Sequence, residues 1–302
     1  MPIPWYNIKQ AKTAAFQKQL RETGGYKSPD GQRRVHLPSI VASPIFAMMM
    51  SELMVTASVH ARRPGFMNKE WSLFGMRVIV LVEKLGGYVE IDGFEKITKL
   101  GRPVVWVSNH VSSLETYMFP PIMMSWPGLI IVLKEELASY PLFGAVVRGV
   151  DPIRIQRKSP VADLRKVLED GKAGIEAGRS ALIFPQGRRE RLFDPASFNT
   201  LGTKLAQYAK APIVPVAVAT DFLRIGKKYR DLGMSVHPSS PVRISCGPII
   251  PHDLHRDEIQ SRCTDFISTK LAEWEKIDKR KMLVDTKAIA ALETTKTPAL
   301  SK

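Results

Sequence analysis

A histidine and a glutamate stand five positions apart where a predicted strand is followed by a predicted helix. In the stretch VWVSNHVSSLETYMFPP, residues 105–121, His110 follows the strand-like run and Glu115 falls in the first helical turn. A carboxylate in this position can hold one imidazole nitrogen and leave the other free as a base. The alternative is structural, because Ser112 and Glu115 fit a capping box in which the glutamate bonds back to the serine N–H. The capping box does not use His110, so both interpretations stay open.

An arginine-rich loop follows a second apolar strand. In ALIFPQGRRER, residues 181–191, Pro185 and Gly187 predict a tight turn, and Arg188, Arg189 and Arg191 come directly after it. Backbone N–H groups at such a turn, together with guanidinium groups, form a site for phosphate. The alternative is a solvated basic loop.

Two further segments carry weaker signals. DPIRIQRK, residues 151–158, places Arg154 and Arg157 after another predicted strand. In APIVPVAV, residues 211–218, Pro212 and Pro215 bracket a buried strand, and by itself this pattern predicts only packing.

Short apolar strands alternate with amphipathic helices from about residue 91 to residue 284. This alternation predicts an α/β fold with a mostly parallel sheet and helices on both faces. Because parallel strands gather their strand-to-helix loops at one edge, we expect the segments above to meet there. Strands are predicted at 103–108, 129–134, 151–155, 180–184 and 213–218, with 241–246 closing the sheet, and helices at 113–125, 160–178, 199–210 and 257–277, with a short helix ending near Val147.

The flanking regions have a different composition. Residues 1–36 are polar and basic and predict an N-terminal arm, and residues 285–302 predict a loosely ordered tail. Residues 37–90 hold two apolar segments, 37–59 and 71–91, which are either two buried helices or a monotopic hairpin that dips into one leaflet. In the second case Arg33, Arg34, Arg62 and Arg63 would lie at lipid head groups. No uninterrupted apolar run reaches the ~18–20 residues of a membrane span, so neither segment is expected to cross.

Charge and cysteine usage limit the partners and the compartment. The formal net charge of +15 favours nucleic acid, an anionic membrane surface, or phosphorylated and CoA-like substrates. Cys246 and Cys263 follow no metal-binding spacing, which favours a reduced, cytosol-facing compartment, and the N-terminus lacks the layout of a signal peptide.

In their order along the chain, four segments resemble the lysophospholipid acyltransferase family, also called PlsC-like or glycerophosphate acyltransferases. The family's blocks are N-H-x-S-x-x-D/E, a strand with an arginine, F-P-E/Q-G-T-R, and a V-P-V strand. Here they are NHVSSLE (109–115), DPIRIQR (151–157), FPQGRR (184–189) and IVPVAV (213–218). The resemblance covers roughly residues 70–250 and includes the linking segment VLKEELASYPLFG (132–144).

The resemblance implies roles for particular residues. His110 would be the general base and Glu115 its partner, in a loop shaped by Asn109 and Ser112. The implied set that binds the acceptor's phosphate is Lys134, Arg157, Gln186, Gly187, Arg188 and Arg189. Three positions depart from the common pattern: Glu115 replaces Asp, Gln186 replaces Glu, and Arg188 replaces Thr.

The implied reaction moves a fatty acyl group from acyl-CoA or acyl-carrier protein to the free hydroxyl of a lysophospholipid. The expected acceptor is 1-acyl-glycerol-3-phosphate, which gives phosphatidic acid. No metal and no cofactor beyond the acyl donor are expected. The expected location is monotopic, on an anionic phospholipid surface at the cytoplasmic face of the cell membrane.

Four alternatives remain. One is an acyltransferase for another lysolipid, and the second is a catalytically weak lipid-binding relative. A basic nucleic-acid-binding protein would rest on charge alone, because no basic-aromatic motif or zinc-finger spacing is present. A serine hydrolase would need a G-x-S-x-G elbow, to which Ser235 in GMSVH comes nearest. His252 and His255 in HDLH have no plausible third or fourth metal ligand.

Overall fold

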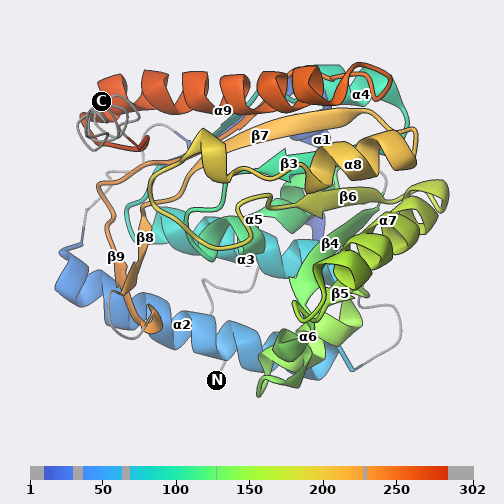
Figure 1. Ribbon diagram of the computed structural model, residues 1–302. Coiled ribbons are helices and arrows are strands. Elements are labelled where there is room, and N and C mark those ends of the chain that lie inside the picture. Colours follow the sequence, from blue (N-terminus) through green and yellow to red (C-terminus); the bar gives the residue numbers. More distant parts are fainter. Residues whose placement is uncertain (1–9, 30–36, 63–68, 127, 227–229, 285–302) are drawn as a thin grey trace, which may run out of the picture.

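The structure is a computed structural model that describes residues 10–29, 37–62, 69–126, 128–226 and 230–284. An eight-stranded sheet runs through it, in the order β1-β2-β10-β7-β3-β6-β4-β5 (Figure 1). Five neighbouring strands, β7, β3, β6, β4 and β5, are parallel, which confirms the predicted mostly parallel sheet. Their bounds, with those of the other three, are β1 Tyr26–Lys27, β2 Val89–Asp92, β3 Val105–Ser108, β4 Leu129–Lys134, β5 Ile153–Ile155, β6 Ser180–Ile183, β7 Ile213–Ala219 and β10 Val242–Cys246.

The strand predicted at 241–246 occupies a different place from the one expected. As β10 it lies between β7 and β2, antiparallel to the first and parallel to the second, and so it does not close the sheet. The edges are β5 and the two-residue β1, which pairs antiparallel with β2. A smaller two-stranded sheet, β8 Leu223–Gly226 and β9 Arg230–Val236, follows β7 in the chain.

Helices cover both faces of the sheet, because alternate strand side chains point to opposite sides. On β3, Trp106 belongs to a core shared with α1, α2, α3 and α5, whereas Val105 and Val107 belong to a core shared with α7, α8 and α9. The helices are α1 Gln10–Thr23, α2 Ser39–His60, α3 Lys69–Lys84, α4 Glu95–Leu100, α5 Leu114–Met123, α6 Phe143–Gly149, α7 Pro160–Glu176, α8 Leu201–Tyr208 and α9 Arg256–Asp278, with 3-10 turns at Glu135–Ser139 and Pro195–Ser197.

The polar N-terminal segment, predicted to be an arm, is folded over residues 10–29. Phe16 and Leu20 lie one helical turn apart on α1 and are both buried in the core. These two side chains hold one face of α1 in the core, and Gln17 and Arg21 donate to the carbonyls of Pro121 and Ser125. The rest of the predicted arm, the predicted tail 285–302, and the head-group arginines Arg33, Arg34 and Arg63 lie outside the described residues.

Helix α2 has two apolar faces. One face packs Phe46, Met49 and Leu53 into the core, and the other exposes side chains to solvent, notably Ile40 and Met48. By length and composition α2 could cross a membrane, although a third of its apolar window is buried inside the protein. Glu52 interrupts the apolar run without making the helix polar, and the expectation that neither apolar segment crosses the membrane stays a prediction. Helix α3, in contrast, packs against α5 as a buried helix.

Candidate active site

The loop between β3 and α5 brings His110 and Glu115 into contact. Nδ1 of His110 lies 2.8 Å from Oε1 of Glu115. The histidine side chain is 16% exposed and the glutamate is fully buried. The ring of His110 also stacks on Phe184, with 4.1 Å between ring centroids, so two contacts fix its orientation. With Nδ1 donating to the carboxylate, Nε2 is left as the acceptor that a general base requires.

Five donors surround the Glu115 carboxylate. Oε1 accepts from His110 Nδ1 and from the backbone N–H groups of Val111 (2.7 Å) and Ser112 (2.8 Å). Oε2 accepts from the hydroxyls of Ser112 (3.0 Å) and Thr220 (2.6 Å). Burial by itself raises the pKa of Glu115, but the hydrogen bond and charge of His110, together with Thr220, outweigh it and hold that pKa below its ordinary value. Glu115 is therefore ionised at neutral pH.

The two interpretations of this joint are both present in the structure. Ser112 donates its N–H to Glu115, and its hydroxyl accepts the N–H of Leu114 at 3.1 Å, a reciprocal pattern similar to a capping box but one residue before Ser113, the N-cap of α5. The same carboxylate holds His110. The helix cap thus gives the acid its place, and the acid in turn orients the imidazole.

Asn109 ties this loop to the neighbouring strand β7. Its Nδ2 donates to the carbonyl of Val218 at 2.9 Å, and its Oδ1 accepts the Val218 N–H at 2.8 Å. Thr220, two residues after Val218 at the end of β7, donates a hydrogen bond to Glu115. Thr220 was not predicted from the sequence; its only signal there is its position directly after a buried strand.

The loop after β6 lies against His110. Oε1 of Gln186 accepts the backbone N–H of His110 at 2.9 Å, and the N–H of Glu190 donates to the His110 carbonyl at 2.7 Å. Gln186 therefore fixes the backbone of His110. A glutamate at this position could accept the same hydrogen bond but would add a negative charge. Gly187 has a φ of 67°, in the left-handed region that favours glycine, so the tight turn requires it.

Of the two candidate arginines, Arg154 is an exposed residue within β5, and Arg157, which follows the strand, reaches this loop. Its Nη2 donates to the Gly187 carbonyl, and its own N–H is held by Asp163 at 2.8 Å. Arg188 pairs with Glu190 and is largely exposed, and Arg189 lies in the same loop, half-buried. Lys134, at the end of β4, is paired with Glu136 at 3.1 Å and is half-exposed.

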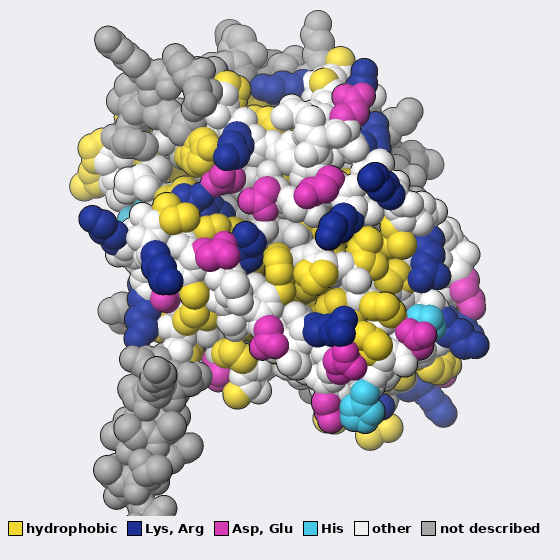
Figure 2. Space-filling view, turned by 90° about the horizontal axis from the view of Figure 1, so that it is seen from above, with side chains coloured by type: hydrophobic (Ala, Val, Ile, Leu, Met, Phe, Trp, Pro, Cys, Tyr) yellow, Lys and Arg dark blue, Asp and Glu magenta, His cyan; other side chains and the backbone are white. Residues whose placement is uncertain are grey.

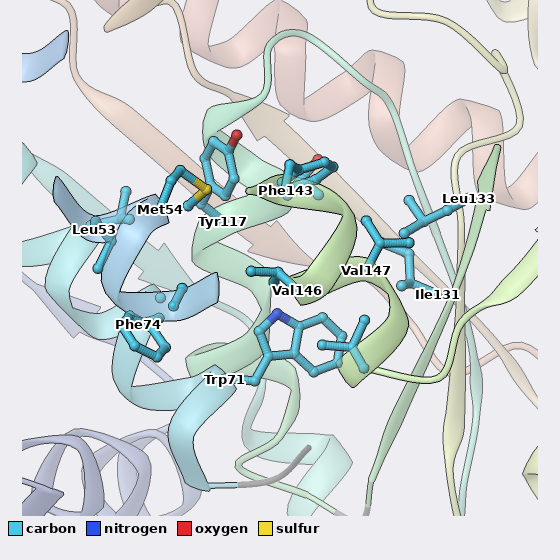
Figure 3. Close-up of a pocket in the computed structure, with 15 residues that line it drawn as sticks. Leu53, Met54, Trp71, Phe74, Tyr117, Ile131, Leu133, Phe143, Val146 and Val147 are labelled. Atoms are coloured by element: carbon cyan, nitrogen blue, oxygen red, sulfur yellow. The ribbon is translucent and has the colours of Figure 1, made fainter. Parts of the chain in front are cut away.

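An apolar pocket lies between α2, α3, α5, α6 and β4, beside the first turn of α5 (Figure 3). Side chains from separate elements converge on it, among them Met54, Trp71, Tyr117, Ile131 and Val146. Its cavity volume is about 60 Å³. Because Thr116 and Tyr117 line it directly after Glu115, the pocket adjoins the first turn of α5.

Ser235 and His255, the residues considered for a hydrolase site and a metal site, make local contacts of other kinds. Ser235 Oγ lies 3.0 Å from His237 Nε2, but Nδ1 of that histidine faces the hydroxyl of Ser39 at 3.5 Å, where a hydrolase triad places a carboxylate. His255 caps α9 by accepting the N–H of Asp257.

Charge is mixed on the side of the molecule that carries α9. Seen from above, Lys and Arg side chains alternate with Asp and Glu and form no continuous basic patch (Figure 2). On α9, Arg262 pairs with Glu258 and Lys270 pairs with Glu273. A nucleic-acid-binding surface would instead gather its cations on one face, so this side of the molecule gives that alternative no support.

Comparisons with known proteins show similarity to acyltransferases. Residues 88–219 match the family model described as Acyltransferase. The chain is 28% identical over 222 residues to a 1-acyl-sn-glycerol-3-phosphate acyltransferase of Pseudomonas aeruginosa, covering 72% of this chain and 81% of that protein. It is 30% identical over 180 residues to a protein of the same name from Saccharomyces cerevisiae, covering 58% of this chain and 56% of the yeast protein.

A solved structure shares the fold. The crystal structure of the 1-acyl-sn-glycerophosphate acyltransferase PlsC from Thermotoga maritima matches with a TM-score of 0.58 and 18% identity, covering 77% of this chain and 95% of that one.

Proposed function

Because this chain carries the acyltransferase domain of the lysophospholipid acyltransferase family, we propose that it transfers a fatty acyl group from a thioester to a lysophospholipid. The acceptor is 1-acyl-glycerol-3-phosphate, the substrate named for the Pseudomonas and yeast relatives. The product is phosphatidic acid. The donor is acyl-CoA or acyl-carrier protein.

The reaction begins with proton removal by His110. Its Nε2 takes the proton of the acceptor hydroxyl while that oxygen attacks the thioester carbonyl carbon. When the tetrahedral intermediate collapses, the carbon–sulfur bond breaks and the imidazolium returns the proton to the leaving sulfur. Glu115 stabilises the imidazolium throughout, and the contact of its carboxylate with Nδ1 at 2.8 Å is the observation that carries this proposal.

The acceptor's phosphate binds at the loop after β6. Arg157 already contacts the Gly187 carbonyl, and Arg188 and Arg189 lie in the same turn. Arginine binds phosphate with two parallel hydrogen bonds, which favours a fixed orientation of the head group relative to His110. Gln186, which holds the His110 backbone, adds no negative charge beside this site.

The acyl chain of the donor lies in the apolar pocket beside α5. Any part of a long chain that the pocket does not hold extends along α2, which contributes Leu53, Met54 and Ala57 to the lining. The outward apolar face of α2, with Ile40 and Met48, rests on the lipid surface from which both lipids arrive. We place this surface at the cytoplasmic face of the membrane, where soluble acyl donors are found.

The test is transfer of a labelled acyl group by purified protein, with a mixture of lysolipid acceptors and detection by mass spectrometry. Wild type should acylate lysophosphatidic acid, and His110→Ala should lose about 10²–10⁴-fold in rate while its thermal unfolding stays unchanged. His252→Ala, a histidine outside the site, is the matched control. If the protein prefers to acylate a lysolipid without phosphate, the assignment of lysophosphatidic acid as the acceptor is wrong. If His110→Ala keeps full activity, His110 is not the general base.

A further inference from the structure

The two departures from the family pattern in the loop after β6 contact the same side chain. Gln186 replaces Glu and Arg188 replaces Thr, and Glu190 follows both in the loop. Nε2 of Gln186 donates to Oε2 of Glu190 at 3.4 Å, and Nε of Arg188 contacts Oε1 of Glu190 at 2.5 Å. Each oxygen of this carboxylate therefore serves one of the two replaced positions.

The side-chain amide of Gln186 has an acceptor side and a donor side, and its neighbours require one orientation. The backbone N–H of His110 needs an acceptor, which is Oε1 of Gln186 at 2.9 Å. Nε2 therefore faces the other way, and there it meets the carboxylate of Glu190. If the amide were rotated by half a turn, Nε2 would face the His110 N–H and two donors would meet. Glu190 thus stabilises the amide orientation that supports His110.

Glu190 also holds the same histidine through its own backbone. The N–H of Glu190 donates to the His110 carbonyl at 2.7 Å. Both backbone groups of His110 are therefore fixed from the loop after β6, one by Gln186 and one by Glu190, and the Glu190 carboxylate links these two supports. Because the imidazole is attached to this backbone, a shift of the loop would move Nε2 relative to the acceptor hydroxyl. Misplacement by about 1 Å can lower a rate about 100-fold.

The carboxylate of the family pattern has changed its place in this loop. The common glutamate at position 186 would accept the N–H of the histidine directly, whereas Gln186 is neutral and has the carboxylate of Glu190 against its amide. Arg188, where the pattern has threonine, adds a cation that pairs with this carboxylate. Arg157 and Arg189 match arginines of the family pattern, so the change is confined to positions 186, 188 and 190.

We propose that Glu190 is a positioning residue for the base: its carboxylate replaces the common glutamate at 186, orients the Gln186 amide and so fixes the backbone of His110. This inference rests on the proposed function, in which His110 is the general base. It requires one carboxylate shared between positions 186 and 190. Two carboxylates in contact would repel each other, and with none the amide orientation would be less fixed and Arg188 would lose this partner.

An exchange of the two side chains tests the proposal. We expect Glu190→Gln and Gln186→Glu each to lower kcat about tenfold, and for Glu190→Gln the KM of neither substrate should rise. The double variant Gln186→Glu/Glu190→Gln restores one carboxylate and should recover most of the wild-type kcat. Glu169→Gln on α7, an exposed glutamate paired with Arg165, is the control for the loss of one negative charge and should match wild type. Additive losses in the double variant, or an effect of Glu190→Gln on KM alone, would overturn the proposal.

Hydrogen exchange at the His110 amide separates this inference from the proposed function. With isotope-labelled histidine, only the backbone amides of the six histidines give signals in an NMR spectrum of the intact protein. The His110 N–H should exchange about tenfold faster in Glu190→Gln than in wild type, and the double variant should return toward wild type, even if no acyl transfer is detected. Gln186→Ala, which removes the acceptor itself, sets the upper limit, and thermal unfolding checks that each variant keeps its fold. Wild-type exchange at His110 in Glu190→Gln would show that this carboxylate does not position the base.

Discussion

Thr220 Oγ1 donates a 2.6 Å hydrogen bond to Oε2 of Glu115, a residue 105 positions away in the sequence. The bond joins the end of β7 to the first turn of α5, at the carboxyl ends of the central strands β7 and β3. It completes the set of donors that keeps this carboxylate ionised while it is fully buried. The acid partner of His110 therefore depends on a residue outside the local histidine–glutamate segment.

Removing this hydroxyl should weaken both the fold and the catalysis. Thr220→Val keeps the shape of the side chain but leaves Glu115 without one donor. We expect the free energy of unfolding in urea to fall by about 1.5–3 kcal/mol, as for a hydrogen bond to a charged group, and the rate of transfer to fall with it. Thr220→Ser, which keeps a hydroxyl, should stay close to wild type. A valine variant with wild-type stability would show that the other four donors suffice.

The depressed pKa of Glu115 predicts a pH-dependent stability. Because the carboxylate is held below its ordinary pKa of 4.5 in the folded state, it stabilises the fold above that value. This contribution is lost as pH falls from 4.5 through the lower folded-state pKa. The difference in Tm between wild type and Glu115→Gln should therefore shrink as pH is lowered through this window. The surface variant Glu169→Gln should show no such trend, and a constant difference for Glu115→Gln would contradict the assignment.

Filling the apolar pocket should shift acyl-chain preference. Val146 on α6 points into the pocket, and Val146→Phe would occupy the space of about two methylene groups (Figure 3). Each buried methylene contributes ~0.8 kcal/mol, so kcat/KM for long acyl chains should fall roughly tenfold relative to short ones. Val161→Phe on α7, where the side chain is 78% exposed, is the control. An unchanged ratio of long-chain to short-chain rates would exclude this pocket as the acyl site.

The outward face of α2 should bind lipid. Ile40 is 84% and Met48 59% exposed, and the double variant Ile40→Ser/Met48→Ser removes apolar area that a bilayer would bury. We expect sedimentation with anionic vesicles to weaken by about tenfold or more. Ile277→Ser is the matched control, because this residue is 64% exposed on α9, across the molecule from α2 (Figure 1). Equal losses for both variants would show that the effect is general surface hydrophobicity.

The sequence was most informative where the determining residues are close together. His110, Ser112 and Glu115 interact within six positions, so a local pattern could place them. The central strands β3, β6 and β7 were predictable because each is a short apolar run buried on both faces. The same reasoning failed for β1, whose two residues are too few for a periodic pattern.

Contacts between distant segments could not be read from the sequence. Nothing local pairs Thr220 with Glu115, or Asp221 with Arg191, because both contacts depend on which strand lies beside β3. The insertion of β10 between β7 and β2 was missed for the same reason. Lys134 was assigned from resemblance alone, and its contact with Glu136 is local.

The pairing of Asn109 with Val218 limits where this chain can change in length. Ser108 is aligned with Val216, and the Asn109 amide bonds both backbone groups of Val218, two residues further along β7, so the strand end is locked in place. A single residue inserted before Thr220 would turn every following side chain to the opposite face, removing the acid's support and the orientation of Arg191 together. Insertions among natural homologues should therefore gather after Asp221, in the β8–β9 hairpin, and be excluded from β7.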